Sequence, residues 1–240
     1  MLEINKVYIG DCLELMPSIE DKSIDMILCD LPYGVTARNK WDVPIPLDLL
    51  WKEYKRIIKD NGAILLFGMQ PFTSLLVTSN LPMFKYELIW RKQLPTGFLN
   101  AKKQPLRNHE SLLVFYKKQP TYNPQFSEGK PYKVKCGGTS ANYGKQKSIA
   151  TVSDGTRYPL SVLDFAGDKN KLHPTQKPVA LCEYLIKTYT NENELVLDNC
   201  AGSGSTGVAC QNTNRSYILI EKEPKYYNII NQRLKENSNS

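Results

Sequence analysis

A glycine-rich turn between an apolar run and a helical stretch is the feature that most constrains the fold of this chain. Residues 195–197 are apolar, and Gly202, Gly204 and Gly207 follow with the spacing Gly-x-Gly-x-x-Gly. Such glycines let a ligand approach the backbone at the N-terminus of a helix. Glu221 ends the next apolar run, where a carboxylate can accept hydrogen bonds from both hydroxyls of a ribose. The pattern predicts a strand–turn–helix–strand unit that binds a nucleoside cofactor, although an ordinary turn without a ligand stays open.

Asp198, at the mouth of this turn, narrows the choice of cofactor. Its carboxylate would repel a pyrophosphate and would favour the ammonium group of a methionine-bearing cofactor. The chain contains no Gly-Lys-Ser/Thr sequence, so the turn is not a phosphate loop for ATP. A nicotinamide dinucleotide remains as a remoter alternative.

A second apolar run, at residues 24–29 and interrupted only by Asp25, leads into Asp30-Leu31-Pro32-Tyr33. The exocyclic amine of adenine or cytosine is a poor nucleophile, because its lone pair is delocalised into the ring. Asp30 and the Pro32 carbonyl can accept its two N–H groups and localise that pair, and Tyr33 can stack on a base swung out of a duplex. The chain has no Pro-Cys dipeptide, which argues against methylation of a cytosine carbon. A plain strand-ending turn is the alternative.

Strand and helix patterns alternate through most of the chain. Strands are expected at residues 7–9, 24–28, 63–67, 86–90, 111–116, 195–197 and 217–220, and helices at 12–16, from Pro46 to a stop at Asn61-Gly62, at 72–80, from Pro178, at 205–212 and from Pro224. This alternation implies an α/β fold with a mostly parallel sheet covered on both faces. We expect residues 1–116 and 172–240 to form two halves of one domain around an irregular insert at 117–171, with a basic loop at 92–108.

The positive charge of the chain is concentrated in its middle third. The net charge is +7, and residues 92–171 hold 14 Lys/Arg against 5 Asp/Glu. Because these lysines are interleaved with aromatic residues, the segment suits a nucleic acid, although a solvated lysine-rich surface is the open alternative. The candidate DNA-binding residues are Lys102, Lys103, Arg107, Lys133, Lys135, Lys145 and Lys147.

Cysteine and histidine usage and hydropathy exclude several classes. The six cysteines include no Cys-x-x-Cys pair and the chain has only two histidines, so neither a disulfide framework nor a metal site is expected. No apolar stretch approaches the ~20 residues that cross a bilayer, and the N-terminus is no signal peptide. We therefore expect a cytoplasmic protein without membrane contact.

Together with Lys171-Leu172-His173-Pro174-Thr175-Gln176-Lys177-Pro178, the two turns resemble one family. The chain is similar to the amino-group DNA methyltransferases of bacteria and phages, which methylate adenine N6 or cytosine N4 with S-adenosylmethionine. The order of motifs, with the catalytic tetrapeptide before the glycine turn, resembles the family's β permutation. The resemblance covers nearly the whole chain outside residues 117–168. It implies a circularly permuted, Rossmann-like sheet of seven strands with one reversed strand, plus a target-recognition insert.

The resemblance also implies roles for single residues. Asp30, Pro32 and Tyr33 would be catalytic. The cofactor would lie against Asp11, Cys12, Asp30, His173, Thr175, Gln176, Lys177, Asp198, Cys200, Gly202, Gly204, Ser205, Thr206 and Glu221. Two sites depart from the family pattern: Leu31 replaces a usual proline, which should make the loop less rigid, and Asn199-Cys200 replaces a usual Pro-Phe pair.

An aspartate at position 30 favours adenine N6, because the cytosine-N4 members usually carry serine there. The implied partner is double-stranded DNA in a bacterial cell, with the protein encoded by the bacterium or by a phage. A restriction-modification role and a homodimer are further expectations. Cytosine N4, an amine of RNA or protein, and a catalytically silent DNA-binding relative remain as alternatives.

Overall fold

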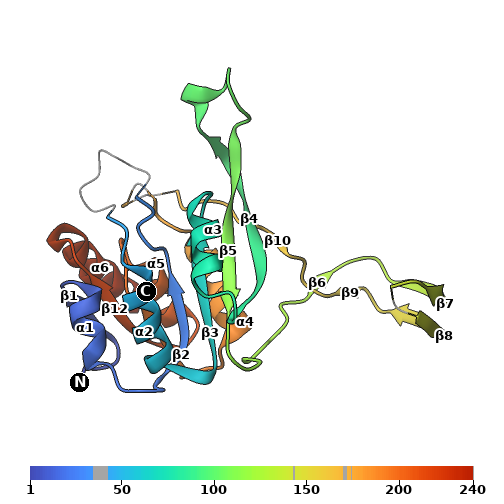
Figure 1. The fold of residues 1–240 in the computed structure, drawn as a ribbon, viewed down its shortest axis with the longest axis horizontal. Helices are drawn as coiled ribbons and strands as arrows, with labels where there is room; N and C mark the ends of the chain where they lie inside the picture. The colour runs from blue at the N-terminus through green and yellow to red at the C-terminus, as the bar shows by residue number, and fades with distance from the viewer. Residues whose placement is uncertain (35–42, 143, 170–171, 174, 240) are drawn as a thin grey trace. The chain divides into compact units, whose positions relative to one another are not determined.

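A largely parallel sheet forms the centre of the protein in the computed structural model, which describes residues 1–34, 43–142, 144–169, 172–173 and 175–239 (Figure 1). Its strands are β1 (Lys6–Ile9), β2 (Ile24–Cys29), β3 (Ile58–Gly68), β4 (Phe84–Thr96), β5 (Arg107–Phe115), β10 (Val162–Asp164), β11 (Leu195–Asp198) and β12 (Ser216–Glu221). Among the described residues the order is β1-β12-β11-β2-β3-β5-β4-β10. Neighbouring strands are parallel except at β5, which is antiparallel to both β3 and β4. The predicted α/β fold with a mostly parallel sheet and one reversed strand is confirmed.

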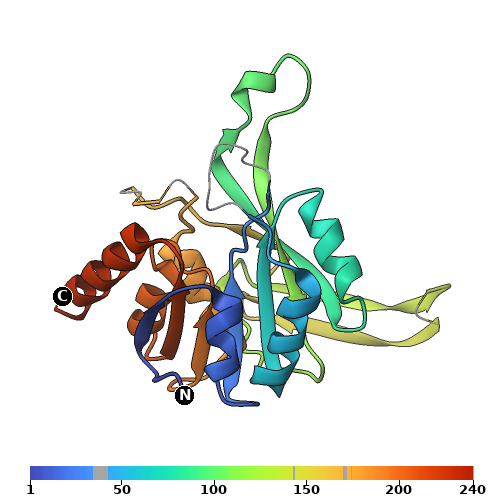
Figure 2. The same ribbon diagram turned by 60° about the vertical axis from the view of Figure 1, so that its left-hand side comes forward.

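Helices cover both faces of this sheet (Figure 2). On one face lie α1 (Cys12–Leu15), followed by the short η1 (Met16–Ser18), α2 (Leu47–Ile57) and α3 (Phe72–Ser79), and on the other lie α4 (Val179–Tyr189), α5 (Ser205–Asn212) and α6 (Pro224–Ser238). Alternation along β3 produces the two layers: Ile64 and Leu66 pack with α1–α3, whereas Leu65 and Phe67 pack with α4–α6. All four side chains are at most 2% exposed. Because both faces of the strand are buried, its sequence is a continuous apolar run without alternating polar residues.

The expected helix from Pro46 ends earlier than its sequence pattern predicts. α2 ends at Ile57, and Ile58 already pairs with Ile24 as the first residue of β3. The expected stop at Asn61-Gly62 lies inside β3, where the pairing with β2 is irregular. A Cβ at Gly62 would lie 2.8 Å from the Asp25 carbonyl oxygen, so this glycine permits close approach of two strands.

The segment expected to be a basic loop at 92–108 begins and ends in strand, and its middle, residues 97–106, contains no strand. β4 continues to Thr96 and β5 begins at Arg107, so the two strands form a hairpin whose tip contains η2 (Phe98–Asn100). A further strand, β10, comes from the region expected to be insert and pairs in parallel with β4. With β10 the sheet has one strand more than the seven expected. The sequence did not predict β10, because its three residues are too few to show an apolar pattern.

A separate compact unit comprises residues 124–160. It contains β6 (Ser127–Glu128) paired with β9 (Thr156–Arg157), and a longer hairpin of β7 (Tyr132–Ser140) and β8 (Gly144–Ser153). The guanidinium of Arg157 lies 4.6 Å from the ring centroid of Tyr132, and Phe126 packs edge-on against Tyr158. The unit is shorter than the expected insert at 117–171, since the residues on either side of it belong to the sheet domain.

None of the helices in the described part of the chain combines the length and apolar character needed to span a membrane.

Candidate active site

Three carboxylates lie where neighbouring parallel strands end. Asp30 follows β2, Asp198 ends β11 and Glu221 ends β12. Because these strands are parallel neighbours, their carboxyl ends meet at one edge of the sheet. A cavity of about 380 Å³ opens at that edge, the position at which open α/β sheets bind ligands.

Nearly all the residues expected at the site line this cavity. They are Asp11, Cys12, Asp30, Pro32, Tyr33, His173, Thr175, Gln176, Lys177, Asp198, Cys200, Gly202, Ser205, Thr206 and Glu221. The exception is Gly204, which packs against α6 instead: its φ is +80°, and a Cβ there would lie 2.9 Å from Ile230 Cγ2. The tertiary fold thus brings together segments from both ends of the chain.

Glu221 holds the glycine turn in place. The Gly202 N–H donates to one carboxylate oxygen at 2.7 Å, and the Glu223 N–H donates to the other at 2.8 Å. Gly202 has a φ of +54°, so the turn uses the left-handed conformation that glycine adopts without strain. Each carboxylate oxygen retains a second lone pair, so Glu221 can also accept hydrogen bonds from the hydroxyls of a ribose.

Asp198 is buried beside the same turn. Burial raises the pKa of its carboxyl to about 6, although hydrogen bonds from Thr206 Oγ1 at 2.6 Å and the Cys200 N–H at 3.1 Å favour the ionised form. Because burial makes ionisation of this carboxyl group unfavourable, a cation bound beside it would stabilise the ionised form strongly. The ammonium group of S-adenosylmethionine is such a cation, so Asp198 and Glu221 together fit the two polar ends of this cofactor.

Side-chain hydrogen bonds fasten the segment before α4 to the glycine turn. Ser205 Oγ donates to the Lys177 carbonyl at 2.8 Å, and Ser203 Oγ donates to Gln176 Oε1 at 3.1 Å. Gln176 Nε2 in turn donates to Asp168 Oδ2 at 2.6 Å. The two motifs that the sequence places far from the tetrapeptide therefore act as one unit in the fold.

His173 lies in this segment as a neutral ring. Burial lowers the pKa of its imidazole to about 4, and the nearby ammonium groups of Lys177 and Lys225 act in the same direction. Its Nδ1 accepts the Thr175 N–H at 3.2 Å, and its ring centroid lies 4.3 Å from that of Tyr226. A neutral imidazole that packs at a tilt of 59° against the Tyr226 ring suits a binding wall better than a proton-transfer role.

Asp30 uses both carboxylate oxygens in the structure. The Tyr33 hydroxyl donates to Oδ1 at 2.5 Å, and the Lys177 ammonium donates to Oδ2. Burial raises the pKa of the Asp30 carboxyl and the carboxylate of Glu110 adds to this rise, whereas Lys177 opposes it. The Tyr33 ring lies 5.1 Å from the ring of Phe72, which supports it from one side.

Glu110 and Lys92 extend this ion pair into a buried network that the sequence interpretation missed. Glu110 forms an ion pair with the Lys177 ammonium at 3.2 Å and a second ion pair with Lys92. Burial disfavours the ionised form of Glu110, but the ammonium groups of Lys177 and Lys92 outweigh it and hold its pKa below the usual range. The only local signal was a lone acid two residues before the apolar run of β5, and nothing in its spacing linked it to Asp30.

The two departures from the family pattern are both packed. Leu31 is only 3% exposed and belongs to the apolar cluster on the α1–α3 face. That the loop is less rigid than one with proline at this position stays a prediction. Asn199 Oδ1 accepts a hydrogen bond from the Tyr54 hydroxyl at 2.5 Å, which ties the end of β11 to α2.

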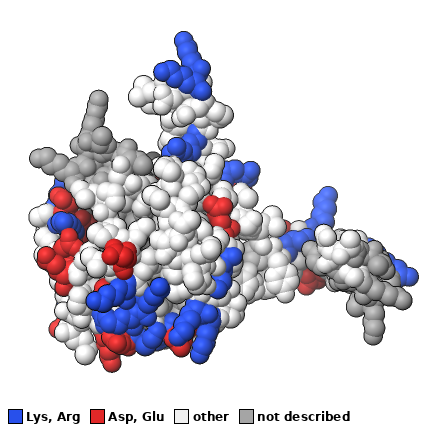
Figure 3. Space-filling model, in the orientation of Figure 1, with Lys and Arg blue, Asp and Glu red and all other residues white. Residues whose placement is uncertain are grey.

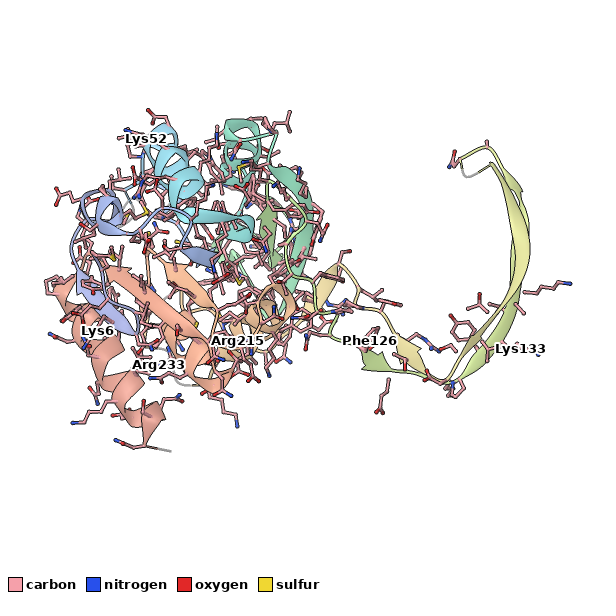
Figure 4. The ribbon with its side chains drawn as sticks, turned by 90° about the horizontal axis from the view of Figure 1, so that it is seen from below. Lys6, Lys52, Phe126, Lys133, Arg215 and Arg233 are labelled. Atoms are coloured by element: carbon pink, nitrogen blue, oxygen red, sulfur yellow. The ribbon has the colours of Figure 1, made fainter. Side chains whose placement is uncertain are left out.

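The candidate DNA-binding residues fall into two places. Lys102 and Lys103 are exposed near the tip of the β4–β5 hairpin, where Figure 3 shows a group of cationic side chains, and Arg107 begins β5. Lys133 and Lys135 are exposed on β7, and Figure 4 shows Lys133 pointing away from the ribbon. The side chains of Lys145 and Lys147 lie outside the described residues. Within the described ranges, no group of His, Cys, Asp or Glu could hold a metal ion.

The fold and the cavity define a class: a Rossmann-like transferase with an S-adenosylmethionine site beside an acidic tetrapeptide. Comparison with known proteins makes the class specific. The sequence profile described as DNA methylase, of the N6/N4 methyltransferases, matches residues 24–232. The chain belongs to this family of S-adenosylmethionine-dependent DNA methylases.

Methyltransferases are among the relatives and solved structures that resemble the chain. The type II methyltransferase M.HinfI of Haemophilus influenzae is 30% identical, over 97% of this chain and 69% of its own length. The DNA adenine methyltransferase YhdJ of Escherichia coli K12 is 27% identical, over 97% of this chain and 83% of its own. The structure of the M1.HpyAVI–SAM complex is 26% identical with a TM-score of 0.65, over 95% of this chain and 98% of that one. The cytosine-N4-specific PvuII methyltransferase, 16% identical with a TM-score of 0.70 over 100% and 93% of the two chains, shares the fold.

Proposed function

We propose that this protein transfers a methyl group to N6 of adenine in double-stranded DNA. The observation that carries the proposal is the carboxylate of Asp30, which faces the same cavity as the glycine turn and Glu221. Aspartate rather than serine at this position favours adenine over cytosine N4. The adenine activity stated in the name of YhdJ supports the same choice.

The geometry supports a role for Asp30 as an acceptor of the target amine. Asp30 accepts one N–H, the Pro32 carbonyl accepts the other, and the nitrogen lone pair becomes localised for attack. Tyr33 stacks on the extruded base. S-adenosylmethionine, when bound, supplies an electrophilic methyl group on its sulfonium. After transfer, the amine gives up one proton, which the Asp30 carboxylate accepts because burial raises its pKa.

The other site residues are proposed to bind the cofactor. Glu221 holds the ribose, Asp11 and Cys12 lie by the adenine, and Asp198 faces the ammonium group. His173, Thr175, Gln176 and Lys177 flank the methionine end, while Cys200, Gly202, Ser205 and Thr206 form the surrounding wall. Gly204 shapes the turn without lining the cavity.

The proposed DNA contacts are the candidate lysines and arginine on the β4–β5 hairpin and on the 124–160 unit. A homodimer and a cytoplasmic location in a bacterial cell are part of the same proposal. Sedimentation at increasing protein concentration, with and without DNA, tests the dimer.

The deciding experiment incubates the protein with mixed-sequence duplex DNA and labelled S-adenosylmethionine, followed by nucleoside analysis. We expect N6-methyladenine, and methylation-sensitive sequencing then gives the target site. N4-methylcytosine would contradict the adenine assignment, and label in RNA but not in DNA would contradict the substrate. Asp30→Ala is the matched control: it should retain cofactor binding by calorimetry and lose turnover by at least about 10²-fold.

A further inference from the structure

The tip of the β4–β5 hairpin exposes apolar side chains to an unusual degree. Leu94 is 80% exposed, Phe98 77% and Leu99 85%. Phe98 and Leu99 are adjacent in η2 and Leu94 precedes them near the end of β4. These three residues are called the apolar tip. Contiguous exposed apolar side chains on a soluble domain mark an interaction site.

The apolar tip is held in one conformation by its own backbone. Gly97, with a φ of +88°, turns the chain, and the Asn100 N–H donates to its carbonyl at 2.9 Å. The Ala101 and Lys103 N–H groups continue this pattern, at 3.1 Å to Phe98 and 2.8 Å to Asn100. A turn with satisfied hydrogen bonds presents Phe98 and Leu99 without the entropy loss that a loose loop would suffer on binding.

Charge around the tip selects a polyanion as the occupant. Residues 92–108 carry four Lys/Arg and no Asp or Glu. Lys102 and Lys103 lie within five residues of Phe98 and are exposed. An apolar end with two exposed lysines beside it matches a nucleic acid, whose phosphates are accessible from outside and whose base stack is apolar inside.

The base of the same hairpin belongs to the active site. Glu110 on β5 and Lys92 on β4 form the ion network that reaches Asp30 through Lys177. Figures 1 and 2 show the hairpin rising from this edge of the sheet. The hairpin therefore connects the apolar tip to the cavity that is proposed to take the target base.

We propose that the apolar tip is a wedge: Phe98, backed by Leu94 and Leu99, enters the DNA duplex next to the target base and fills the space that the extruded base leaves. The inference rests on the proposed function. Extrusion of a base costs a few kcal/mol of stacking and pairing. Insertion of an apolar side chain between base steps recovers part of that free energy. An aromatic ring recovers more of it than an aliphatic side chain does, because it stacks on the neighbouring bases.

The test separates base extrusion from DNA binding. A duplex carrying 2-aminopurine at the target position is titrated with protein and S-adenosylhomocysteine, so that the fluorescence readout needs no methyl transfer. For Phe98→Ala we expect loss of the fluorescence rise and a drop of about tenfold or more in the single-turnover methylation rate. Its affinity for duplex at low salt should remain within about threefold of wild type, because phosphate contacts dominate affinity.

A rescue experiment gives the sharpest outcome. A mismatch opposite the target base lowers the free energy of extrusion, so it should restore the rate of Phe98→Ala towards that of wild type. Lys102→Gln should instead weaken affinity and flatten its salt dependence, without rescue by the mismatch. Leu75→Ala, which truncates a 57%-exposed leucine on α3, controls for loss of any surface apolar group.

Wild-type fluorescence and rate in Phe98→Ala would overturn the wedge while leaving the methyltransferase proposal intact. A rate loss that the mismatch does not rescue would also overturn it. If the wild type sediments as a dimer and Phe98→Ala as a monomer, while base extrusion by the variant is unchanged, the tip serves self-association instead. Absence of methyl transfer by the wild type, with the fluorescence rise present, would contradict the proposed function but not the wedge.

Discussion

The carboxylate of Asp30 is shared between the hydroxyl of Tyr33 and the ammonium of Lys177. A target amine has to displace one of these donors or bind beside it. Lys177 also forms an ion pair with a second carboxylate, Glu110 at 3.2 Å, and Glu110 is itself neutralised by Lys92. The charges of two carboxylates and two ammonium groups thus compensate one another. The strength of these ion pairs determines how readily the Asp30 carboxylate can accept a hydrogen bond from the target amine.

Variants of this network should shift the pH–rate profile in opposite directions. Asp30 must be ionised to accept an N–H, so its pKa sets the acidic limb. Lys177→Met removes the cation that opposes the rise in the pKa of Asp30, so the limb should move to higher pH. Glu110→Gln removes an anion that raises it, so the limb should move to lower pH. Single-turnover rates between pH 5 and 9 measure both; shifts of the same sign would contradict the network.

The pKa of Asp198 predicts how cofactor affinity depends on pH. Its pKa of about 6 in the folded protein lies above the usual value of 3.8. Between these two pH values the folded, cofactor-free protein therefore holds a proton on Asp198 that the unfolded chain has released. The free energy of unfolding from this group therefore decreases as pH rises from about 4 to about 6 and then levels off. The cofactor's ammonium favours the ionised form, so affinity should increase over the upper part of that window.

Calorimetry checks this expectation. Affinity for S-adenosylmethionine should be roughly tenfold lower at pH 5 than at pH 7, because only about a tenth of Asp198 is ionised at the lower pH. Asp198→Asn should bind weakly with little pH dependence. An affinity that is flat in the wild type would show that Asp198 does not face the ammonium group.

At the scale of elements, the glycine turn combines two different demands. Gly202 and Gly204 both have positive φ, but their surroundings differ. A Cβ at Gly202 would meet nothing within 4 Å, whereas one at Gly204 would meet Ile230 on α6. Gly202 lines the cavity, and Gly204 lets α5 and α6 pack beside the turn.

Alanine at the two positions should therefore have separable effects. Gly204→Ala should lower the free energy of unfolding by about 2–3 kcal/mol, because backbone strain and overlap with Ile230 add. Gly202→Ala should cost only about 1 kcal/mol, from strain alone, but should weaken cofactor binding. Urea unfolding and calorimetry on both variants measure the difference, and equal destabilisation would contradict the packing role of Gly204.

Across the whole molecule, the described residues that line the cavity all belong to the sheet domain, and none of those described at 124–160 lines it. The cofactor site and the exposed lysines of β7 therefore belong to different compact units. This division separates cofactor binding from part of the proposed DNA contact.

Replacement of residues 124–160 by a short Gly-Ser linker should test that separation. The melting temperature and cofactor affinity should stay near the wild-type values, while DNA affinity falls. The double variant Lys133→Gln/Lys135→Gln is the control: it should reduce the slope of log affinity against log salt by about two. Loss of cofactor binding in the deletion variant would show that the unit supports the sheet domain.

Much of the site could be predicted because its motifs are local. The Asp30 tetrapeptide, the glycine turn and Glu221 each end a strand whose apolar run is visible in sequence. Other features could not, because they depend on pairing between distant segments. β10 is recognisable only beside β4, and Ile58 joins a strand rather than a helix because Ile24 lies opposite it.

The sequence by itself determined the alternation of strands and helices, the chemistry of the tetrapeptide and the order of the motifs, since all three depend on residue type and short-range spacing. Only the tertiary structure decided that Lys177 links Glu110 and Lys92 to Asp30, and that Gly204 serves packing. It also decided that Leu94, Phe98 and Leu99 stay exposed. The reason is physical: burial, ion pairing and exposure are properties of neighbours in space, and the sheet brings those neighbours from across the chain.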